Sequence, residues 1–322
     1  MPQHYQSYRL LSYKVNRPLC KDEIRDHMPR DKPSQSKPYC QMTVLKMNST
    51  FLECVDKFYG GRGAITATGI VMGPLTFGLA KVPFQRLFRY SDIPTDAMGI
   101  FHIVFSFLIV LPYLALYIFA LRMECFRHTH YPLRFNRKTR MVHVFRTNGT
   151  VLSVPWDKLY FTLGYGAVGI WEVLGHLLAE DGKTIKETFV LSTAYMREDR
   201  ELRSQWEFIR RYMEEGPEKL YDQVITMYPV DKRKEPYLFG LKRFSMHFAY
   251  WPIVTLIFSP LILLGSIGRW IAMRTCKIPR WPAEVEAESE IEPNDPYICD
   301  ERHLASYNDM LTVFRRGLIG SG

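Results

Sequence analysis

One run of 25 residues constrains this chain more than any other feature. Ala97 to Leu121 contains no Asp, Glu, Lys or Arg. A helix rises about 1.5 Å per residue, so a helical run of this length exceeds the roughly 30 Å hydrocarbon core of a bilayer. We therefore expect a transmembrane helix here, with lipid as the solvent around part of the molecule.

A second uncharged segment precedes the first. Gly63 to Ala80 is rich in Gly, Ala and Thr, and small residues let helices approach closely in lipid. Gly69 and Gly73 lie four residues apart, which would place both on one helix face. We expect this segment and the next to form a two-helix membrane hairpin. The alternative is a buried core helix of a soluble domain.

A third segment, Phe244 to Gly268, also lacks formal charges. Pro252 and Pro260 interrupt it, and each removes a helical hydrogen-bond donor and crowds the preceding turn. We expect either a kinked span or a broken element that enters and leaves on one side.

Basic residues are distributed unevenly along the chain, which carries a net charge of +9. The segment 122–147 has seven Lys and Arg against one acid, whereas the connector 81–96 has three against two. Lys and Arg near span ends stay in the cytoplasm, so we expect a cytoplasmic N-terminus, a cytoplasmic domain after Leu121, and the connector outside. A nucleic-acid patch at 122–147 is disfavoured because the segment adjoins a span.

The cysteines and the N-terminal residues bear on the compartment. Six cysteines without a Cys-x-x-Cys pair argue against a zinc site and a disulfide framework, and fit reduced cytosolic thiols. Residues 1–40 are polar, so no secretory signal peptide is expected. The alternation over 44–58 predicts a short strand or an amphipathic segment that enters the membrane.

After the second span the pattern changes to period two. Strands are predicted at 141–146 and 151–156, joined by Asn148-Gly149, because such turns favour positive φ at both positions. Further strands are predicted at 158–163, 171–178 and 184–191. A helix over 197–215 follows, with an apolar stripe that includes Trp206. Antiparallel hairpins closed by one helix predict a pleckstrin-homology-like (PH-like) β-domain.

The fold class is thus an α+β membrane protein with six segments. These are a cytoplasmic leader (1–62), a two-helix transmembrane hairpin (63–121), a cytoplasmic PH-like β-domain with its capping helix (122–217), a connector (218–243), a third membrane segment (244–273) and a polar acidic tail (274–322). The tail alternates Glu with small residues, and we expect it to be disordered or loosely docked.

No motif in the sequence predicts a catalytic, cofactor or metal site, so we expect a non-enzymatic protein. Gly164, Gly166 and Gly169 have dinucleotide-fingerprint spacing, but they lie in a predicted β-meander rather than a βαβ unit. His102 and His247 are the only side chains in the apolar segments that titrate near neutral pH, and transporters usually show buried acids or bases there.

The candidate contacts for a partner or for lipid are basic and aromatic side chains of the β-domain. The basic residues next to the membrane suit anionic headgroups, and the stripe on the helix would pack on the sheet or form a partner groove. The candidates are Arg134, Arg137, Lys138, Arg140 and Trp206.

The order of these parts resembles a known family. The residues that carry the resemblance are PLRFNRKTRMVHVFRTNGTVLSVPWDKLYF (132–161) and WEVLGHLLAEDGKTIKETFVL (171–191), with the pattern RFNRK…VFR…G…PWD. The chain resembles, over about 60–190, an uncharacterised family of proteobacterial inner-membrane proteins often encoded beside type VI secretion genes. The resemblance implies a bacterial inner membrane and a role with secreted effectors. It transfers no site residue.

The sequence therefore favours a multi-span inner-membrane protein that contacts membrane lipid and binds a protein partner. The resemblance implies that this partner is a secretion effector and that the chain is its immunity or accessory protein. A membrane-anchored lipid-sensing PH-like module is one alternative, and a small transporter or channel is another. The oligomeric state stays open, and no nucleic acid is expected.

Overall fold

The structure, a computed structural model, consists of two compact units. The β unit comes from three stretches within 1–60, 130–233 and 278–322, and the helical unit from two, 61–129 and 234–277. The residues that the structure describes are 8–9, 12–40, 43–56, 59–88, 97–165, 171–194, 199–224, 227–230, 232–246 and 252–300.

One sheet of the β unit has five antiparallel strands in the order β4-β5-β6-β7-β8. The strands are β4 (Val44–Met47), β5 (Phe51–Cys54), β6 (Leu133–Asn136), β7 (Met141–Phe145) and β8 (Val151–Pro155). Strands β5 and β6 are neighbours in the sheet although residues 55–132 separate them in sequence. Phe51 lies opposite Asn136 and Cys54 opposite Leu133. Residues 55–132 are therefore an insertion between two neighbouring strands of this sheet.

The second sheet has four antiparallel strands in the order β3-β11-β10-β9. They are β3 (Arg17–Pro18), β9 (Leu159–Tyr165), β10 (Trp171–Leu178) and β11 (Thr184–Ala194), while β1 (Tyr8–Arg9) and β2 (Ser12–Tyr13) form a separate pair. The helices of this unit are α1 (Lys21–Arg25), α4 (Asp199–Glu215) and α8 (Ala283–Ala287), with 3-10 turns at Trp156–Lys158 and Tyr221–Gln223.

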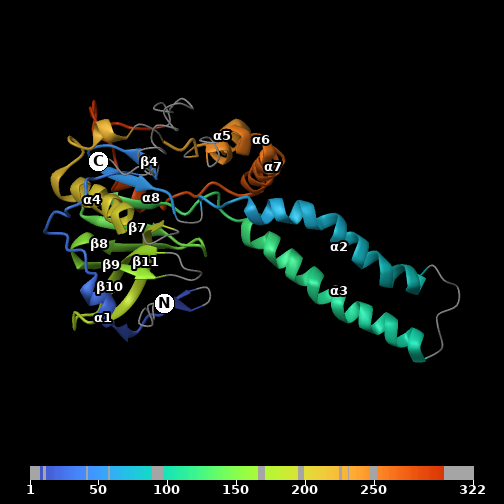
Figure 1. Ribbon diagram of the computed structural model, residues 1–322. Helices are drawn as coiled ribbons and strands as arrows, with labels where there is room; N and C mark the ends of the chain where they lie inside the picture. Colours follow the sequence, from blue (N-terminus) through green and yellow to red (C-terminus); the bar gives the residue numbers. More distant parts are fainter. Residues whose placement is uncertain are drawn as a thin grey trace. The chain divides into compact units, whose positions relative to one another are not determined.

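The core of the β unit contains side chains from both sheets and from α4, which packs on β10 and β11 (Figure 1). An aromatic cluster lies at its centre. The Trp206 ring centroid is 4.4 Å from that of Phe161 and 5.7 Å from that of Trp156. Trp206 is fully buried. Of the two alternatives for the stripe on α4, the structure therefore shows packing on the sheet rather than an open partner groove.

Strands β7 to β11 and helix α4 occur where the sequence predicts them, but one turn differs. Gly149 has a φ of +86°, whereas Asn148 does not adopt positive φ. The Asn148 Oδ1 atom instead accepts hydrogen bonds from the backbone N–H and the hydroxyl of Thr150, at 3.0 and 2.7 Å. The expectation of positive φ at both positions is wrong for Asn148, whose side chain stabilises the turn.

The segments expected to be a leader and a tail contribute to the β unit. Strands β3, β4 and β5 come from the N-terminal segment, and β4 and β5 are almost wholly buried. The C-terminal residues Trp281 to Cys299 cross the five-stranded sheet, and the backbones of Met47 and Cys299 exchange hydrogen bonds of 3.0 and 2.7 Å. We call this stretch the C-terminal strap. The polar composition of the tail does not reveal that it packs on the sheet, because the strap binds through charged side chains and backbone groups.

The helical unit contains the apolar segments. It consists of α2 (Ala64–Phe88), α3 (Ala97–Glu124), α5 (Tyr237–Met246), α6 (Pro252–Ile257) and α7 (Ser259–Thr275). Helices α2 and α3 pack against each other. Among the described residues, α3 is the one helix long and apolar enough to cross a bilayer, and the apolar part of α2, Ala64–Leu79, is shorter.

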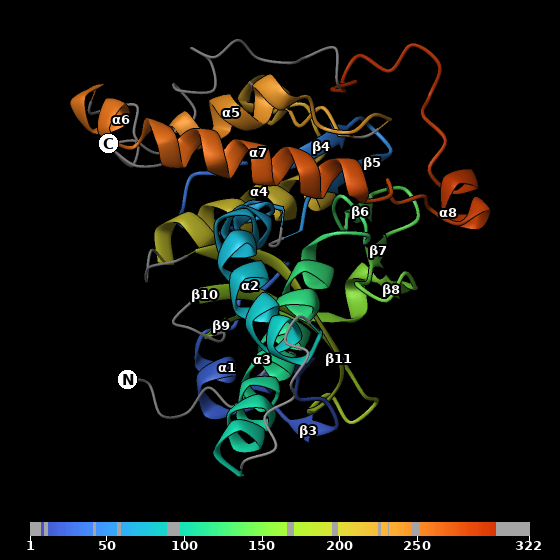
Figure 2. The same ribbon diagram turned by 90° about the vertical axis from the view of Figure 1, so that its right-hand side faces the viewer.

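The third apolar segment is divided among separate helices. Pro252 begins α6, and Pro260 lies in the first turn of α7, where a missing N–H costs nothing. Pro252 thus begins a helix, and Pro260 closely follows the break at Phe258 between α6 and α7. Helix α7 runs across the direction of α2 and α3, with its contacts to α2 near the start of that helix (Figure 2).

Candidate functional site

Most of the surface of α3 is apolar and open. Only 11% of its most apolar 18-residue window is buried, and Leu108 in the middle of the helix is 67% exposed. The core helix of a soluble protein would be mostly buried. Exposed apolar residues on α2, such as Phe77, extend the same kind of surface. Contiguous apolar area of this kind marks an interaction site.

Small residues allow α2 and α3 to pack closely. A Cβ atom built on Gly69 would lie 2.7 Å from a methyl of Leu121, so a larger residue cannot fit without displacement. The Tyr117 hydroxyl donates a 3.0 Å hydrogen bond to the Gly69 carbonyl, and the Thr76 hydroxyl lies 3.3 Å from that of Tyr113. The predicted small-residue face is therefore used at the helix contact.

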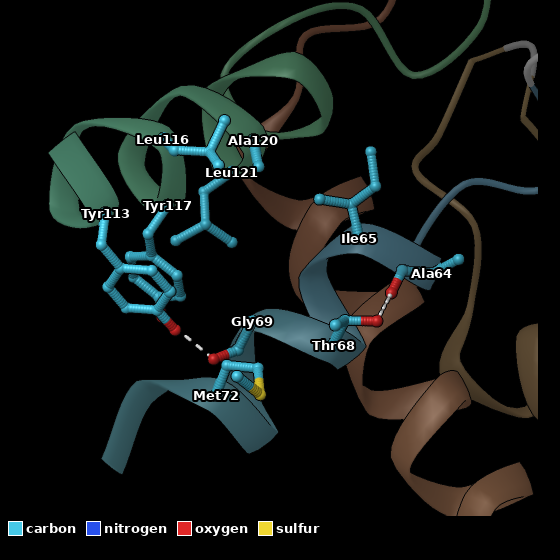
Figure 3. Close-up of a pocket in the computed structure, with 10 residues that line it drawn as sticks. All are labelled: Ala64, Ile65, Thr68, Gly69, Met72, Tyr113, Leu116, Tyr117, Ala120 and Leu121. Carbon is cyan, nitrogen blue, oxygen red and sulfur yellow. Dashed lines mark hydrogen bonds between the residues drawn. The ribbon is translucent and has the colours of Figure 1, made fainter. Parts of the chain in front are cut away.

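A pocket of about 410 Å³ lies between these two helices (Figure 3). The tyrosine rings and leucine side chains of α3 face the small residues of α2 across it. Such a lining offers dispersion contacts and hardly any polar partners, so it suits a hydrocarbon chain or an apolar side chain. The lining residues are Ala64, Ile65, Thr68, Gly69, Met72, Tyr113, Leu116, Tyr117, Ala120 and Leu121.

A buried carboxylate joins the end of α3 to the start of α2. Glu124 accepts hydrogen bonds from the backbone N–H of Gly63 at 2.5 Å and of Thr66 at 2.7 Å, and from the Thr66 hydroxyl at 2.5 Å. The first N–H groups of a helix have no intrahelical partner, and a negative charge there is favourable. Glu124 therefore caps α2 from another helix.

A buried ion pair lies beside this cap. The Arg269 guanidinium of α7 donates two hydrogen bonds to the Glu235 carboxylate, at 2.6 and 2.7 Å, and a third of 3.0 Å to the Arg62 carbonyl. Both side chains of the pair are at most 2% exposed. Arg62 in turn donates a 3.0 Å hydrogen bond to the Glu124 carbonyl. The start of α2, the end of α3 and the middle of α7 thus meet in one polar cluster, which we call the basal cluster. Its members are Arg62, Glu124, Glu235 and Arg269.

Glycines bring the backbones of α2 and α7 into contact at the basal cluster. A Cβ on Gly268 would lie 2.5 Å from the Ala67 nitrogen, and one on Gly63 would lie 2.3 Å from the Arg269 Cα. Gly63 also has a φ of +99°, which favours glycine. The sequence interpretation missed this cluster, because its four charged residues are far apart in the chain. The signal available was an arginine next to Gly268 and Gly265 in an apolar helix.

The predicted contact residue Arg134 is buried rather than exposed. Its guanidinium lies between the rings of Phe51 and Trp281, at 4.5 and 4.9 Å from their centroids. It forms ion pairs with Glu53 at 2.8 Å and with Glu286 of the strap at 3.2 Å. Its side chain is 1% exposed. The strap therefore occupies the surface that this arginine would otherwise present.

The other predicted contact residues also have partners within the β unit. Lys138 forms an ion pair with Glu292 of the strap. Arg140 binds Asp157 at 2.6 Å and Glu214 at 2.9 Å. The Arg137 guanidinium lies beside Gly216. The strap thus pairs with both Arg134, which is buried, and Lys138, which stays exposed, while Trp206 lies apart from them in the core.

The remaining sequence candidates do not form a chemical centre. Gly164 lies in β9, which is antiparallel to β10, while Gly166 and Gly169 fall outside the described residues, as does His247. His102 is exposed on α3. Across the described ranges, no three His, Cys, Asp or Glu side chains are grouped so as to hold a metal ion. All six cysteines are free.

Replacing Glu235 with alanine should strongly destabilise the helical unit, because Arg269 would stay buried without its carboxylate. We expect a loss of about 3–5 kcal/mol in the free energy of unfolding of the detergent-solubilised chain. The double variant Glu235→Leu with Arg269→Met should regain most of this loss, and Lys242→Ala, at an exposed position of α5, should have little effect. Equal stability of Glu235→Ala and the unchanged chain would contradict the importance of the pair.

Acid should weaken the β unit through His143, which lies beneath the strap with its Nδ1 atom 2.8 Å from the Ser153 hydroxyl. Burial, helped by the charge of Arg134, lowers the pKa of His143 from 6.5 to about 4. The unfolded chain therefore binds more protons between these values, so stability is full above pH 6.5 and falls towards pH 4. We expect about 2 kcal/mol less stability at pH 5 than at pH 7. Unfolding curves of His143→Gln should show a smaller difference between the two pH values.

Comparison with known proteins identifies a family. The model of a family of unknown function, DUF6708, matches residues 108–293, more than half of the chain. The match includes most of α3, strands β6 to β11, and the helices from α4 to α8. No curated protein and no solved structure matches significantly. The expectation of an uncharacterised family is thus confirmed, and the chain belongs to the DUF6708 family of unknown function.

Proposed function

We propose that this protein is inserted in a membrane by the α2–α3 hairpin and holds its β unit at the cytoplasmic surface, where the β unit binds a protein partner. The observation that carries the proposal is the open apolar surface of α3, with Leu108 67% exposed at its centre. In water this surface would order solvent and aggregate. In a bilayer the same side chains meet hydrocarbon.

Strand pairing supports a hairpin over a single span. Strands β5 and β6 are hydrogen-bonded neighbours, so the chain between residues 55 and 132 must leave and return on one side of any membrane. Two crossings satisfy this condition and one does not. The Glu124 cap at the start of α2 likewise keeps the entry and the exit of the hairpin together.

Charge supports a cytoplasmic β unit. Basic residues lie in the last turn of α3 and just after it, among them Arg122 and Arg127, and the connector 81–96 is poorer in them. With the implied family context, we propose a bacterial inner membrane as the location. The two antiparallel sheets and α4 are compatible with the PH-like architecture proposed for this unit.

The proposed role is that of a non-enzymatic immunity or accessory protein for a type VI secretion effector. The order of parts that resembles such inner-membrane proteins supports it. The lipid-sensing alternative is less favoured, because Arg134 and Lys138 are paired with acids of the strap rather than presented to headgroups. The transporter alternative is less favoured because the buried charges Arg269 and Glu235 neutralise each other.

Membrane insertion predicts that the chain stays in the membrane pellet after alkaline carbonate extraction. Leu108→Arg should increase the extractable fraction, because an arginine at the centre of a span costs about 2.5–3.5 kcal/mol. Lys219→Arg in the β unit serves as the control. In intact cells, an impermeant maleimide should label Asp92→Cys and spare Lys219→Cys. Full extraction of the unchanged chain would refute insertion, and the reverse labelling would refute the orientation.

Partner binding predicts that the full chain, solubilised in mild detergent, co-purifies with a secretion effector encoded beside it. Co-expression should also restore growth of cells that produce the effector. The Leu108→Arg variant should lose this protection if the effector acts at the bilayer. A chain that neither binds nor protects would rule out the immunity or accessory role and leave membrane insertion intact.

A further inference from the structure

Helices α6 and α7 present an apolar stripe that stays exposed among the described residues of the helical unit. Leu263 and Ile267 are 47% and 41% exposed, and Trp270 is exposed one turn further on. The spacing of four and three residues places these side chains on one face of α7. Gly265, Gly268 and Ala272 lie on the opposite, buried face.

This stripe cannot belong to a single membrane span. The strap returns to the β unit, where Glu286 pairs with Arg134 and Cys299 pairs with Met47. The chain between the β unit and the strap, residues 234–277, therefore also leaves and returns on one side. Helix α7 has 17 residues and runs across the direction of α2 and α3 (Figure 2). An element parallel to the membrane plane meets both conditions.

Charge indicates which surface the stripe would meet. Within the described residues 234–246 and 252–277, Glu235 is the one carboxylate, and it is buried against Arg269. The exposed charges of this stretch are basic and include Lys242, Arg274 and Lys277. Arg274 lies over the Trp270 ring, 5.8 Å from its centroid. An apolar face bordered by Trp and basic side chains is typical of helices that lie in the interface of an anionic bilayer.

We propose that α6 and α7 lie in the membrane interface, with Leu263 and Ile267 among the upper acyl chains and with Arg274 and Lys277 on anionic headgroups. The proposal rests on the membrane insertion of α2 and α3 argued above. It commits to lipid as the occupant because the stripe continues the apolar surface of the same unit and its charged border is basic. The basal cluster would then fix α7 against the foot of the hairpin.

Depth measurements on the full chain test the proposal. The chain carrying Cys20→Ser would be spin-labelled at Leu263→Cys or Ile267→Cys and reconstituted in nanodiscs of phosphatidylcholine and phosphatidylglycerol. Collisions with oxygen and with a water-soluble nickel complex report depth. We expect one shallow depth at both positions, a deep signal at Leu108→Cys and an aqueous signal at Lys219→Cys.

The outcomes separate this proposal from the one on which it rests. Aqueous signals at Leu263→Cys and Ile267→Cys with a deep Leu108→Cys would overturn the interfacial position and keep the hairpin. A depth that increases steadily from one α7 position to the next would indicate a spanning element and would also overturn it. An aqueous signal at Leu108→Cys as well would refute membrane insertion itself.

A second comparison tests whether anionic headgroups hold α7. Moving the chain to pure phosphatidylcholine should make the Ile267→Cys label shallower, and Arg274→Gln with Lys277→Gln should produce the same shift in the mixed bilayer. Lys183→Gln with Lys219→Gln, which removes two exposed lysines of the β unit, should leave the depth unchanged. An Ile267→Cys depth that is the same in both bilayers and in both variants would show that anionic headgroups do not hold α7.

Discussion

The pairing of β5 with β6 is the constraint on which the rest of the structure depends. Four residues of each strand are joined across an interruption of 78 residues, 55–132, and a sheet tolerates such an interruption only if its two ends return to neighbouring positions. An antiparallel pair of helices meets this requirement with no net displacement of the chain. The hairpin is thus an insertion between two strands of one sheet, and the residues before it and after it belong to the same β unit.

Polar groups at the foot of the helices explain how this insertion keeps its geometry. In a bilayer the α2–α3 contact itself gains little from hydrophobicity, because lipid is as apolar as the side chains. Glu124 instead satisfies N–H groups that the start of α2 leaves without partners, and Arg269 donates to the Arg62 carbonyl just before that helix. Each is buried, so loosening the foot would expose a charge to apolar surroundings. Hydrogen bonds, rather than apolar contacts, therefore fix the relative orientation of the helices at the basal cluster.

Much of the local structure could be predicted from the sequence. The period-two runs gave β7 to β11, and the apolar stripe gave α4, because hydrophobic spacing and turn residues are local signals. The basal cluster and the strap could not be predicted in this way. Both join residues far apart in sequence, such as Arg134 with Glu286, and a lone charge in a sequence does not reveal whether it will be solvated or paired. Arg134 in β6 was expected at the surface for this reason.

The strap also sets an order of events during synthesis. Met47 gains a backbone partner, Cys299, that is translated 252 residues after it. By then the apolar helices have long been translated and, in the proposed setting, delivered to the translocon. Strand β4 can pair with β5 early, but its outer edge at Met47 stays without this partner until the strap is translated. The contact of the strap with β4 can therefore form only after β5 and β6, the inner strands of this sheet, have been synthesised.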